Sequence, residues 1–580
     1  MRTQARVAVI GGGAVGCSIL YHLTAAGFRD VMLLERDELT AGSTWHAAGL
    51  LPLFNMSYST GQMHKYSIEL YQRLAAEWQR DVGFRRVGNL RMARTRERME
   101  EFQTYATTAD AVGVPYEWWQ PKDIKERFPL VNVEGLVGAL YHPTDGYINS
   151  ADITMLLADA ARKGGAEINR QTEVRAIERT VGGEWRLVTD KGDIVCETVV
   201  AATGNHAQRT AAMVGLSIPA IPVEHQYIVT GEIPEIVAWR KAGHPEHPIL
   251  RDADARWYMR EERGGLILGP YEKGAPAWAV HGVPEGFKAE LLPPDLDRLE
   301  WHIEEAFFRM PCFAKGGVKT VYNGPICYTP DGNPLVGPAP GLANFYFAEG
   351  FSFGITAAGG AGKYLTQMIT EGEAEIDMLA LDARRFGAYA TRPYAVKKNE
   401  EAYERVFVPH FPDEERPAGR PLRTTPAYDR LKGRGAVFGQ RFGWERANFF
   451  VPDDAGFKEQ WSFRRGNWWP YVKAEAEAIR SNVGLFEAST FAKYAARGPG
   501  AEAWLDRLVA NRLPQKTGRI QLTHACTRTG GVRSEFTIMR DGPEAFYLVG
   551  AGAAETYDWD YLTRTVPKDG SVELEKITTK

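Results

Sequence analysis

Three glycines and one carboxylate near the start of the chain have the spacing of a dinucleotide site. Gly11, Gly13 and Gly16 follow the apolar residues 7–10 in a G-x-G-x-x-G pattern, and Glu35 closes the next apolar run. Between a strand and a helix, the first glycine allows a tight turn, the second lets backbone approach a pyrophosphate, and the third lets helix and strand pack closely. A carboxylate at the end of the second strand can hold both ribose hydroxyls and disfavours NADP. The pattern therefore predicts bound FAD or NAD.

An imidazole follows within the sequence ERDELTAGSTWHAAGL. Gly42, Ser43 and Thr44 are small enough to lie against a cofactor, and His46 comes shortly after them. A neutral histidine, whose ordinary pKa is about 6.5, is a competent nucleophile near neutral pH. The same side chain beside Trp45 could instead cap a buried turn, and the residues alone leave both interpretations open. We include Ser43, Thr44 and His46 among the candidate cofactor-binding residues.

The elements that must position these groups begin with a βαβ unit. Residues 7–10 and 31–35 predict two strands that flank the helix CSILYHLTAAG. After a helix near residues 153–166, apolar strands return to the nucleotide domain, and we include Val174 on one of them among the cofactor-binding candidates. Residues 219–325 are rich in aromatic residues and short strands, which predicts an antiparallel sheet covering a substrate pocket.

Composition excludes several classes of function. The chain has 580 residues, more than one core usually fills, and its formal net charge of -4 gives no reason to expect nucleic-acid binding. Its five cysteines are scattered and never form C-x-x-C, and its histidines lack metal-ligand spacing, so we expect neither a disulfide framework nor a metal site. No apolar run reaches about 18 residues and no leader is evident, so we expect no membrane span and a cytoplasmic location.

The segment STWHAAGL, which contains His46, resembles the dimethylglycine and sarcosine dehydrogenase family of flavoproteins. The resemblance implies FAD rather than NAD, with His46 bonded covalently to the 8α-methyl of the flavin. It also implies a small N-methylated amino acid as substrate. Oxygen or an electron-transfer flavoprotein would be the electron acceptor.

His225 in HQY and Tyr258 in RWYMRE also resemble positions that this family places at the substrate face of the flavin. Amine oxidation requires a free nitrogen lone pair before hydride leaves the neighbouring carbon, so a group that accepts or steers a proton is useful there. Histidines and tyrosines of antiparallel sheets also often just satisfy one another by hydrogen bonding. We therefore treat His225 and Tyr258 as catalytic candidates, with hydrogen bonding alone as the alternative.

The segment FYFAEGFSFGITAAGGAGKYL, residues 345–365, predicts a strand, a glycine-rich turn and a helix. It resembles the final flavin-contacting loop of the family, where backbone amides and a helix N-terminus can stabilise negative charge. On this basis Gly350, Gly354 and Ile355 are candidate cofactor contacts. The alternative is a turn that serves packing alone.

From about residue 430 the chain resembles the aminomethyltransferase-like, folate-binding half of the same family, through VGLFEAST and GGVRSEFTIMR among other segments. A carboxylate follows the GG turn in such modules, and the matching residue here is Glu535, where aspartate is commoner. This implies positioning or proton transfer on the pterin of tetrahydrofolate; a surface carboxylate is the alternative. The sequence ends at VELEKITTK within a predicted strand, so we expect an incomplete folate module with weak or absent folate binding.

Together these features predict an α/β fold: a Rossmann-type FAD-binding domain with a D-amino-acid-oxidase-like antiparallel substrate sheet, then a partial aminomethyltransferase-like α+β domain. We expect the oxidoreductase region at residues 1–390, a connecting segment at 391–430 and the folate-binding domain at 431–580. The expected reaction is oxidative demethylation of dimethylglycine, sarcosine or a relative, with the carbon released as formaldehyde or passed to tetrahydrofolate. The alternatives are another FAD amine or imino-acid oxidase, and a folate-binding protein with a vestigial flavin site.

Overall fold

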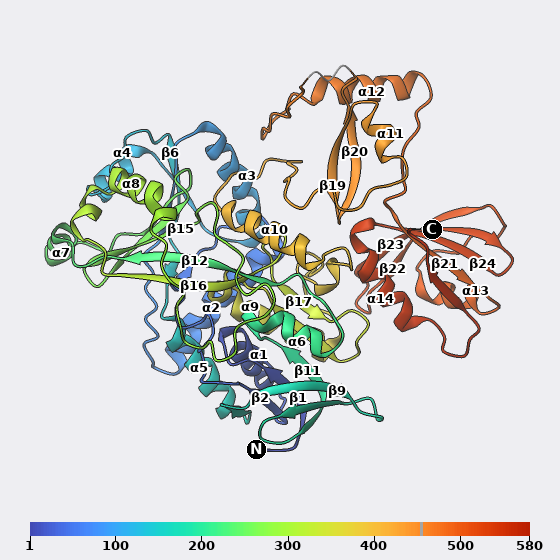
Figure 1. Cartoon of the computed structure of the whole chain (residues 1–580), viewed down its shortest axis with the longest axis horizontal. Coiled ribbons are helices and arrows are strands. Elements are labelled where there is room, and N and C mark those ends of the chain that lie inside the picture. The colour runs from blue at the N-terminus through green and yellow to red at the C-terminus, as the bar shows by residue number, and fades with distance from the viewer. Residues whose placement is uncertain (453–455, 580) are drawn as a thin grey trace. The chain divides into compact units, whose positions relative to one another are not determined.

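The computed structural model describes residues 1–452 and 456–579 (Figure 1). The chain divides into two compact units. The first comprises Met1–Gly337, Asn344–Leu381 and Thr391–Pro412. The second comprises Pro338–Ala343, Asp382–Ala390 and Asp413–Lys580.

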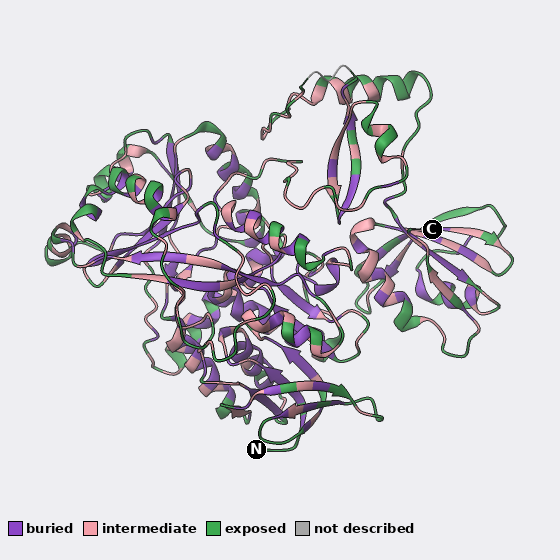
Figure 2. Ribbon diagram, in the orientation of Figure 1, coloured by how far each residue is buried: buried purple, intermediate pink, exposed green. Residues whose placement is uncertain are grey.

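The nucleotide sheet of the first unit is built on a parallel core. Its eight strands have the order β17-β18-β11-β1-β2-β8, with β10 and β9 added antiparallel beside β11. Residues 7–10 of β1 and all four residues of β2 are apolar and buried, as expected of parallel strands covered on both faces (Figure 2). The core strands are β1 (Gln4–Ile10), β2 (Val31–Leu34), β8 (Glu167–Asn169), β11 (Ile194–Ala201), β17 (Leu335–Pro338) and β18 (Phe345–Glu349); the added strands are β9 (Val174–Arg179) and β10 (Trp185–Thr189).

Helices contact one another against this sheet. Helix α1 follows the glycine turn directly and contacts both α5 and α9, while α2 contacts α9. Glycines at the contact let these helices approach closely: a Cβ on Gly360 of α9 would lie 2.4 Å from the carbonyl oxygen of Met63 on α2. The helices are α1 (Ala14–Ala25), α2 (Tyr58–Glu77), α5 (Ser150–Lys163) and α9 (Gly354–Glu371).

The second sheet of the first unit also has eight strands, in the order β16-β12-β15-β14-β13-β4-β6-β5. Neighbouring strands of this sheet are antiparallel except for the parallel pair β13 and β4. The strands are β4 (Asn89–Ala93), β5 (Glu117–Trp119), β6 (Gly138–His142), β12 (Ile221–Val229), β13 (Ile249–Asp252), β14 (Trp257–Glu262), β15 (Gly265–Pro270) and β16 (Thr320–Tyr328).

The two faces of this second sheet carry different side chains. Leu90, Leu250 and Met259 join an apolar cluster that includes residues of the helices α4 (Pro121–Arg127), α7 (Pro234–Lys241) and α8 (Glu300–Arg309). Successive side chains along a strand point to opposite faces. Tyr258, next to Met259, therefore belongs to the other face, where it joins a separate aromatic cluster that includes Tyr403 of helix α10 (Arg392–Glu404).

The second unit contains a five-stranded antiparallel sheet of order β22-β23-β24-β21-β25. Alternating residues such as Phe536 and Ile538 form its buried face, together with Trp504 and Leu562 from helices α13 (Ala501–Leu508) and α14 (Glu555–Thr565). The strands are β21 (Ala492–Arg497), β22 (Ile520–Cys526), β23 (Val532–Gly542), β24 (Ala545–Gly550) and β25 (Glu573–Lys576). A separate hairpin precedes it, made of β19 (Ala436–Arg441) and β20 (Trp444–Phe450).

Within the described ranges 1–452 and 456–579, no helix is long and apolar enough to cross a membrane. Among the same residues, no group of three or more histidine, cysteine or acidic side chains is placed to hold a metal ion.

Candidate active site

A deep cavity lies at the carboxyl ends of the parallel strands in the first unit. Of the eleven residues expected to bind a cofactor, nine line it. These are Gly11, Gly13, Glu35, Ser43, Thr44, His46, Val174, Gly354 and Ile355. Gly16 and Gly350 are absent from the lining. Crevices beyond the carboxyl ends of parallel strands are where nucleotides bind in sheets of this type.

The glycine turn leaves room for a pyrophosphate. Gly11 has a φ of +114°, and a Cβ on it would lie 2.1 Å from the carbonyl oxygen of Ala202. A Cβ on Gly16 would lie 1.9 Å from the carbonyl oxygen of Gly11, so its role is close packing of helix on strand. Gly13 caps α1 without a side-chain hydrogen bond and lines the cavity, so the positive end of the helix faces it.

Two polar groups of the lining complete the fit to a dinucleotide. The Glu35 carboxylate accepts hydrogen bonds from the backbone N–H of Gly12 at 2.6 Å and of Asp37 at 2.8 Å, which fix its position. Each oxygen keeps a second lone pair for a ribose hydroxyl. The side-chain oxygen of Asn205 is buried at the lining without a hydrogen-bond partner among the described residues. These groups fit a nucleotide that brings hydroxyl donors.

His46 is buried against strand β16. A Cβ on Gly324 would lie 2.4 Å from its Cε1, 2.6 Å from Nδ1 and 2.8 Å from Nε2, so only glycine leaves room for this ring. Trp45 contacts the imidazole edge-on, with ring centroids 5.5 Å apart. Burial lowers the pKa of His46 to about 4, so the imidazole is uncharged at neutral pH.

The structure brings His225 and Tyr258 together and adds two further residues. His225 on β12 pairs in register with Gly324 on β16. Its Nε2 lies 3.2 Å from the hydroxyl of Tyr258, and its Nδ1 lies 2.9 Å from the hydroxyl of Tyr403. Tyr403 in turn donates to Glu272 at 2.6 Å. Burial lowers the pKa of His225 to about 3.

Two buried arginines extend this group across the sheet. Arg91 on β4 pairs in register with Arg251 on β13, and Arg251 pairs with Tyr258 on β14, so the three side chains share one face. The guanidinium carbon of Arg251 lies 5.7 Å from the ring centroid of Tyr258. Arg91 stacks on Phe54 at 3.8 Å, and both arginines lie over Phe407, at 5.7 and 5.6 Å.

The two arginines have only more distant anionic neighbours: Glu101 raises the pKa of Arg91 and Asp145 raises that of Arg251, each by less than burial lowers it. Arg91 is 6% exposed and Arg251 is 2% exposed, and the Nε atom of each is buried without a hydrogen bond. No ion pair links either guanidinium to a carboxylate among the residues that the structure describes. Burial is the main cause that lowers the pKa of both, to about 9 for Arg91. Buried cations are costly unless an anion compensates them.

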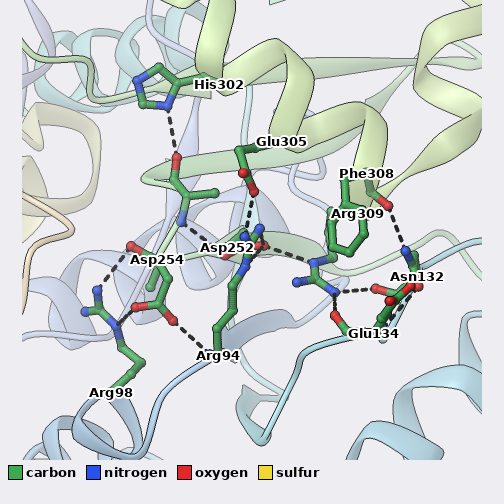
Figure 3. A network of polar contacts seen from close by, with 12 residues as sticks. Arg94, Arg98, Asn132, Glu134, Asp252, Asp254, His302, Glu305, Phe308 and Arg309 are labelled. Carbon is green, nitrogen blue, oxygen red and sulfur yellow. Dashed lines mark hydrogen bonds and ion pairs between the residues drawn. The ribbon is translucent and has the colours of Figure 1, made fainter.

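Other buried arginines of the same unit are compensated, as Figure 3 shows. Arg309 and Asp252 are both fully buried and lie 3.0 Å apart, and Arg94 reaches the same carboxylate at 2.6 Å. Arg98 pairs with Asp254 at 3.0 Å. Arg94, Arg98 and Arg309 therefore have ion pairs with carboxylates, whereas Arg91 and Arg251 beside Tyr258 have none among the described residues.

Glu535 lies in the second unit, on β23. Its carboxylate is 59% exposed and lies 3.1 Å from Nε2 of His524 on the neighbouring strand β22. The adjacent Ser534 is buried and donates to Asp558 at 2.5 Å, and burial raises the pKa of Asp558 to about 7. Glu535 is thus accessible to a ligand, while Ser534 points into the domain.

Sequence reasoning missed four of these residues: Arg91, Arg251, Glu272 and Tyr403. Each comes from a different segment of the chain, and Tyr403 falls within the stretch expected to be a connecting segment. One signal was present, since Arg91 and Arg251 both follow a leucine inside an apolar strand, where a charged residue is unusual.

A cavity at a glycine-rich βαβ turn, joined to an antiparallel substrate sheet, defines an FAD-dependent oxidoreductase. The family description FAD dependent oxidoreductase matches residues 6–368, FAD dependent oxidoreductase central domain matches 371–425, and GCVT N-terminal domain matches 427–580. The predicted fold class and the predicted FAD dependence are thereby confirmed.

Known relatives narrow the family. The chain is 38% identical to "Dimethylglycine dehydrogenase, mitochondrial" of Rattus norvegicus, covering 100% of this chain and 67% of the relative. It is 31% identical to "Sarcosine dehydrogenase, mitochondrial" of Homo sapiens (99% and 66%), and 33% identical to "4-methylaminobutanoate oxidase (formaldehyde-forming)" of Paenarthrobacter nicotinovorans (97% and 68%). The solved L-proline dehydrogenase from P. horikoshii superimposes with a TM-score of 0.58 at 25% identity, covering 66% of this chain and 98% of that one. The chain belongs to the dimethylglycine and sarcosine dehydrogenase family, and spans about two thirds of the length of these relatives.

The predicted cytoplasmic location is wrong. The matching dimethylglycine and sarcosine dehydrogenases are mitochondrial, which contradicts that prediction.

The unpaired arginines predict an unusual stability result. Because Arg251 is a buried cation with no ion pair to a carboxylate within residues 1–452 and 456–579, Arg251→Met should leave the free energy of unfolding of the substrate-free protein unchanged or raise it. The matched variant Arg309→Met breaks a buried pair with Asp252 and should cost about 3 kcal/mol. Thermal unfolding of the two variants and the parent measures the difference. Equal losses in Tm for both variants would show that Arg251 is compensated within the chain.

Proposed function

We propose that this protein oxidises an N-methylated amino acid such as dimethylglycine or sarcosine and releases the methyl carbon as formaldehyde. The observation that carries the proposal is that Arg91 and Arg251 lie side by side next to Tyr258, buried and without an ion pair among the described residues. Paired guanidinium groups are suited to a carboxylate, which they bind through charge-assisted hydrogen bonds. A glycine-type amine held there by its carboxylate would direct its nitrogen toward Tyr258 and His225.

The residues around the amine would have two roles, substrate binding and proton transfer. Arg91 and Arg251 would hold and orient the carboxylate, and Tyr258 with His225 would take the proton that a bound ammonium must lose. When bound in the cavity, FAD would supply the hydride acceptor. Loss of hydride from carbon leaves an iminium substrate, which water hydrolyses to formaldehyde and the demethylated amine. The acceptor that reoxidises the enzyme is proposed to be oxygen or an electron-transfer flavoprotein.

The carboxylate site predicts a substrate-dependent defect. Arg251→Met should raise KM for dimethylglycine roughly 10- to 100-fold, because it removes a hydrogen bond to a charged group. For N,N-dimethylethylamine, which has no carboxylate, kcat/KM should change less than about twofold. Anaerobic loss of the oxidised-flavin absorbance provides both rates. A defect of the same size with both amines would assign Arg251 to the structure of the site rather than to carboxylate binding.

We also propose that His46 tethers the flavin covalently. Support comes from its place in the cavity lining, from its uncharged imidazole and from Gly324, which makes room for the ring. An uncharged imidazole nitrogen has the lone pair that bond formation requires.

The tether predicts that acid precipitation leaves yellow chromophore in the protein pellet, because a covalent bond survives unfolding. His46→Ala should release the chromophore into the supernatant. His206→Ala is a matched control, since His206 also lines the cavity and burial lowers its pKa to about 4. Its chromophore should stay in the pellet. Free flavin in the wild-type supernatant would contradict the tether.

For the second unit we propose a tetrahydrofolate site at Glu535, supported by the accessible carboxylate and by the match to the GCVT N-terminal domain. A carboxylate can position the pterin or carry one of its protons. Tetrahydrofolate bound there would capture the carbon as 5,10-methylene-tetrahydrofolate.

A change at Glu535 should therefore affect carbon capture by tetrahydrofolate without affecting amine oxidation. Glu535→Gln should leave the rate of anaerobic amine oxidation within about twofold, because distant independent sites barely couple. Formation of 5,10-methylene-tetrahydrofolate should fall to the rate seen with free formaldehyde, which condenses spontaneously. If Glu535→Gln captures carbon as fast as the parent, Glu535 has no role in the proposed tetrahydrofolate site.

A further inference from the structure

Four side chains on or beside the face of the second sheet that carries Tyr258, here called the substrate face, form one continuous hydrogen-bonded series: Tyr258, His225, Tyr403 and Glu272. Tyr258, Tyr403 and Glu272 are buried, whereas His225 keeps part of its surface accessible. They come from β14, β12, α10 and the segment after β15. Only the histidine and the first tyrosine were expected from the sequence, and the last two residues have no role in the function proposed above.

The series has a direction, which the chemistry of its end group sets. An ionised carboxylate can only accept hydrogen bonds, so the single O–H of Tyr403 points at Glu272. The Tyr403 oxygen must then accept from His225, which places the ring proton on Nδ1. A neutral imidazole carries one ring proton, so Nε2 is left with a lone pair and accepts from Tyr258. With Glu272 ionised, this is the one arrangement that satisfies all three contacts.

The polar neighbours of Glu272 stabilise its ionised form against the cost of burial. Burial raises the pKa of Glu272 above its ordinary value, and the hydrogen bond from Tyr403 offsets part of that increase. The side-chain amide of Gln226 donates to its other oxygen at 3.4 Å, and the guanidinium of Arg298 lies 3.8 Å away. Every one of these neighbours is a donor or a cation.

We propose that Glu272 and Tyr403 are positioning residues that fix His225 as the tautomer with Nδ1 protonated, so that Nε2 is the proton-accepting atom. The inference rests on the proposed amine oxidation. In the step it serves, the ammonium N–H bond of the substrate breaks and its proton goes to the Tyr258 oxygen. The proton of Tyr258 passes to His225 Nε2. The amine becomes neutral, the imidazole becomes cationic, and no electrons are exchanged.

The same arrangement stabilises the product of that transfer. Burial opposes a charged imidazole at this position, since it lowers the pKa of His225 to about 3. A carboxylate one hydroxyl away offsets part of that cost, as an orienting carboxylate does for a catalytic histidine in general. Without Tyr403 the carboxylate would no longer be linked to the ring, and both tautomers would become accessible.

The tautomer can be measured directly by long-range ¹H–¹⁵N correlation spectra of protein labelled with ¹⁵N at histidine. The His225 signals are assigned from their loss in His225→Gln. In the substrate-free wild type we expect Nδ1 to be protonated and Nε2 to be unprotonated. Tyr403→Phe should lose this preference, and Glu272→Gln should too, because an amide can also donate to the tyrosine oxygen.

Tyr328→Phe is the matched control. Tyr328 is buried, its ring lies 5.7 Å from that of Tyr403, and among the described residues it forms no hydrogen bond with His225. Its spectrum should be that of the wild type and its rate of amine oxidation within about twofold, whereas Tyr403→Phe should be slower by about 10²-fold. A wild-type His225 protonated at Nε2, or an unchanged tautomer in both Tyr403→Phe and Glu272→Gln, would overturn the proposal. Because the spectra need no substrate, lack of amine oxidation alone would count against the proposed function and not against the tautomer.

Discussion

The alternation of side chains across the second sheet is the constraint on which the substrate face depends. Leu90 and Leu250 point into an apolar core beneath helices, so their neighbours Arg91 and Arg251 must point to the opposite face. Parallel pairing of β13 with β4 then sets the two guanidinium groups side by side, and antiparallel pairing with β14 adds Tyr258. A slip of one residue in any of these strands would put cations in the apolar core. The core therefore fixes the chemistry of the other face.

That arrangement is electrostatically unfavourable by itself. Two like charges lie on adjacent strands in a buried place. Burial lowers the pKa of both arginines, and the charge of Arg251 lowers that of Arg91 further. Proteins normally compensate such groups, and this chain does so a few residues away, where Asp252 takes two arginines. Binding of an anionic ligand would relieve the imbalance, so part of the binding free energy comes from a cost already present in the free protein.

Local signals made much of the fold predictable. The glycines of residues 11–16, flanked by apolar strands, determine the nucleotide turn through contacts within one βαβ unit. His225 and Tyr258 were found through family resemblance. Tyr403 and Glu272 were not, because their proximity to His225 results from packing of α10 on the sheet and not from any sequence spacing. The arginines were overlooked for a related reason. A single arginine in a strand indicates no site by itself, and the sequence does not show that the strand register places Arg91 beside Arg251.

Gly324 connects the cofactor cavity to the substrate face. It lies under the ring of His46, where a Cβ would approach three ring atoms closer than 3 Å, and it is the register partner of His225. A rigid ring buried beside Trp45 cannot yield to such a contact as a flexible side chain could. Any larger residue would have to move His46 or separate β16 from β12, which carries His225. The position of the cofactor-facing histidine and that of the proton-accepting histidine are thus set by one missing side chain, and neither can be adjusted without the other.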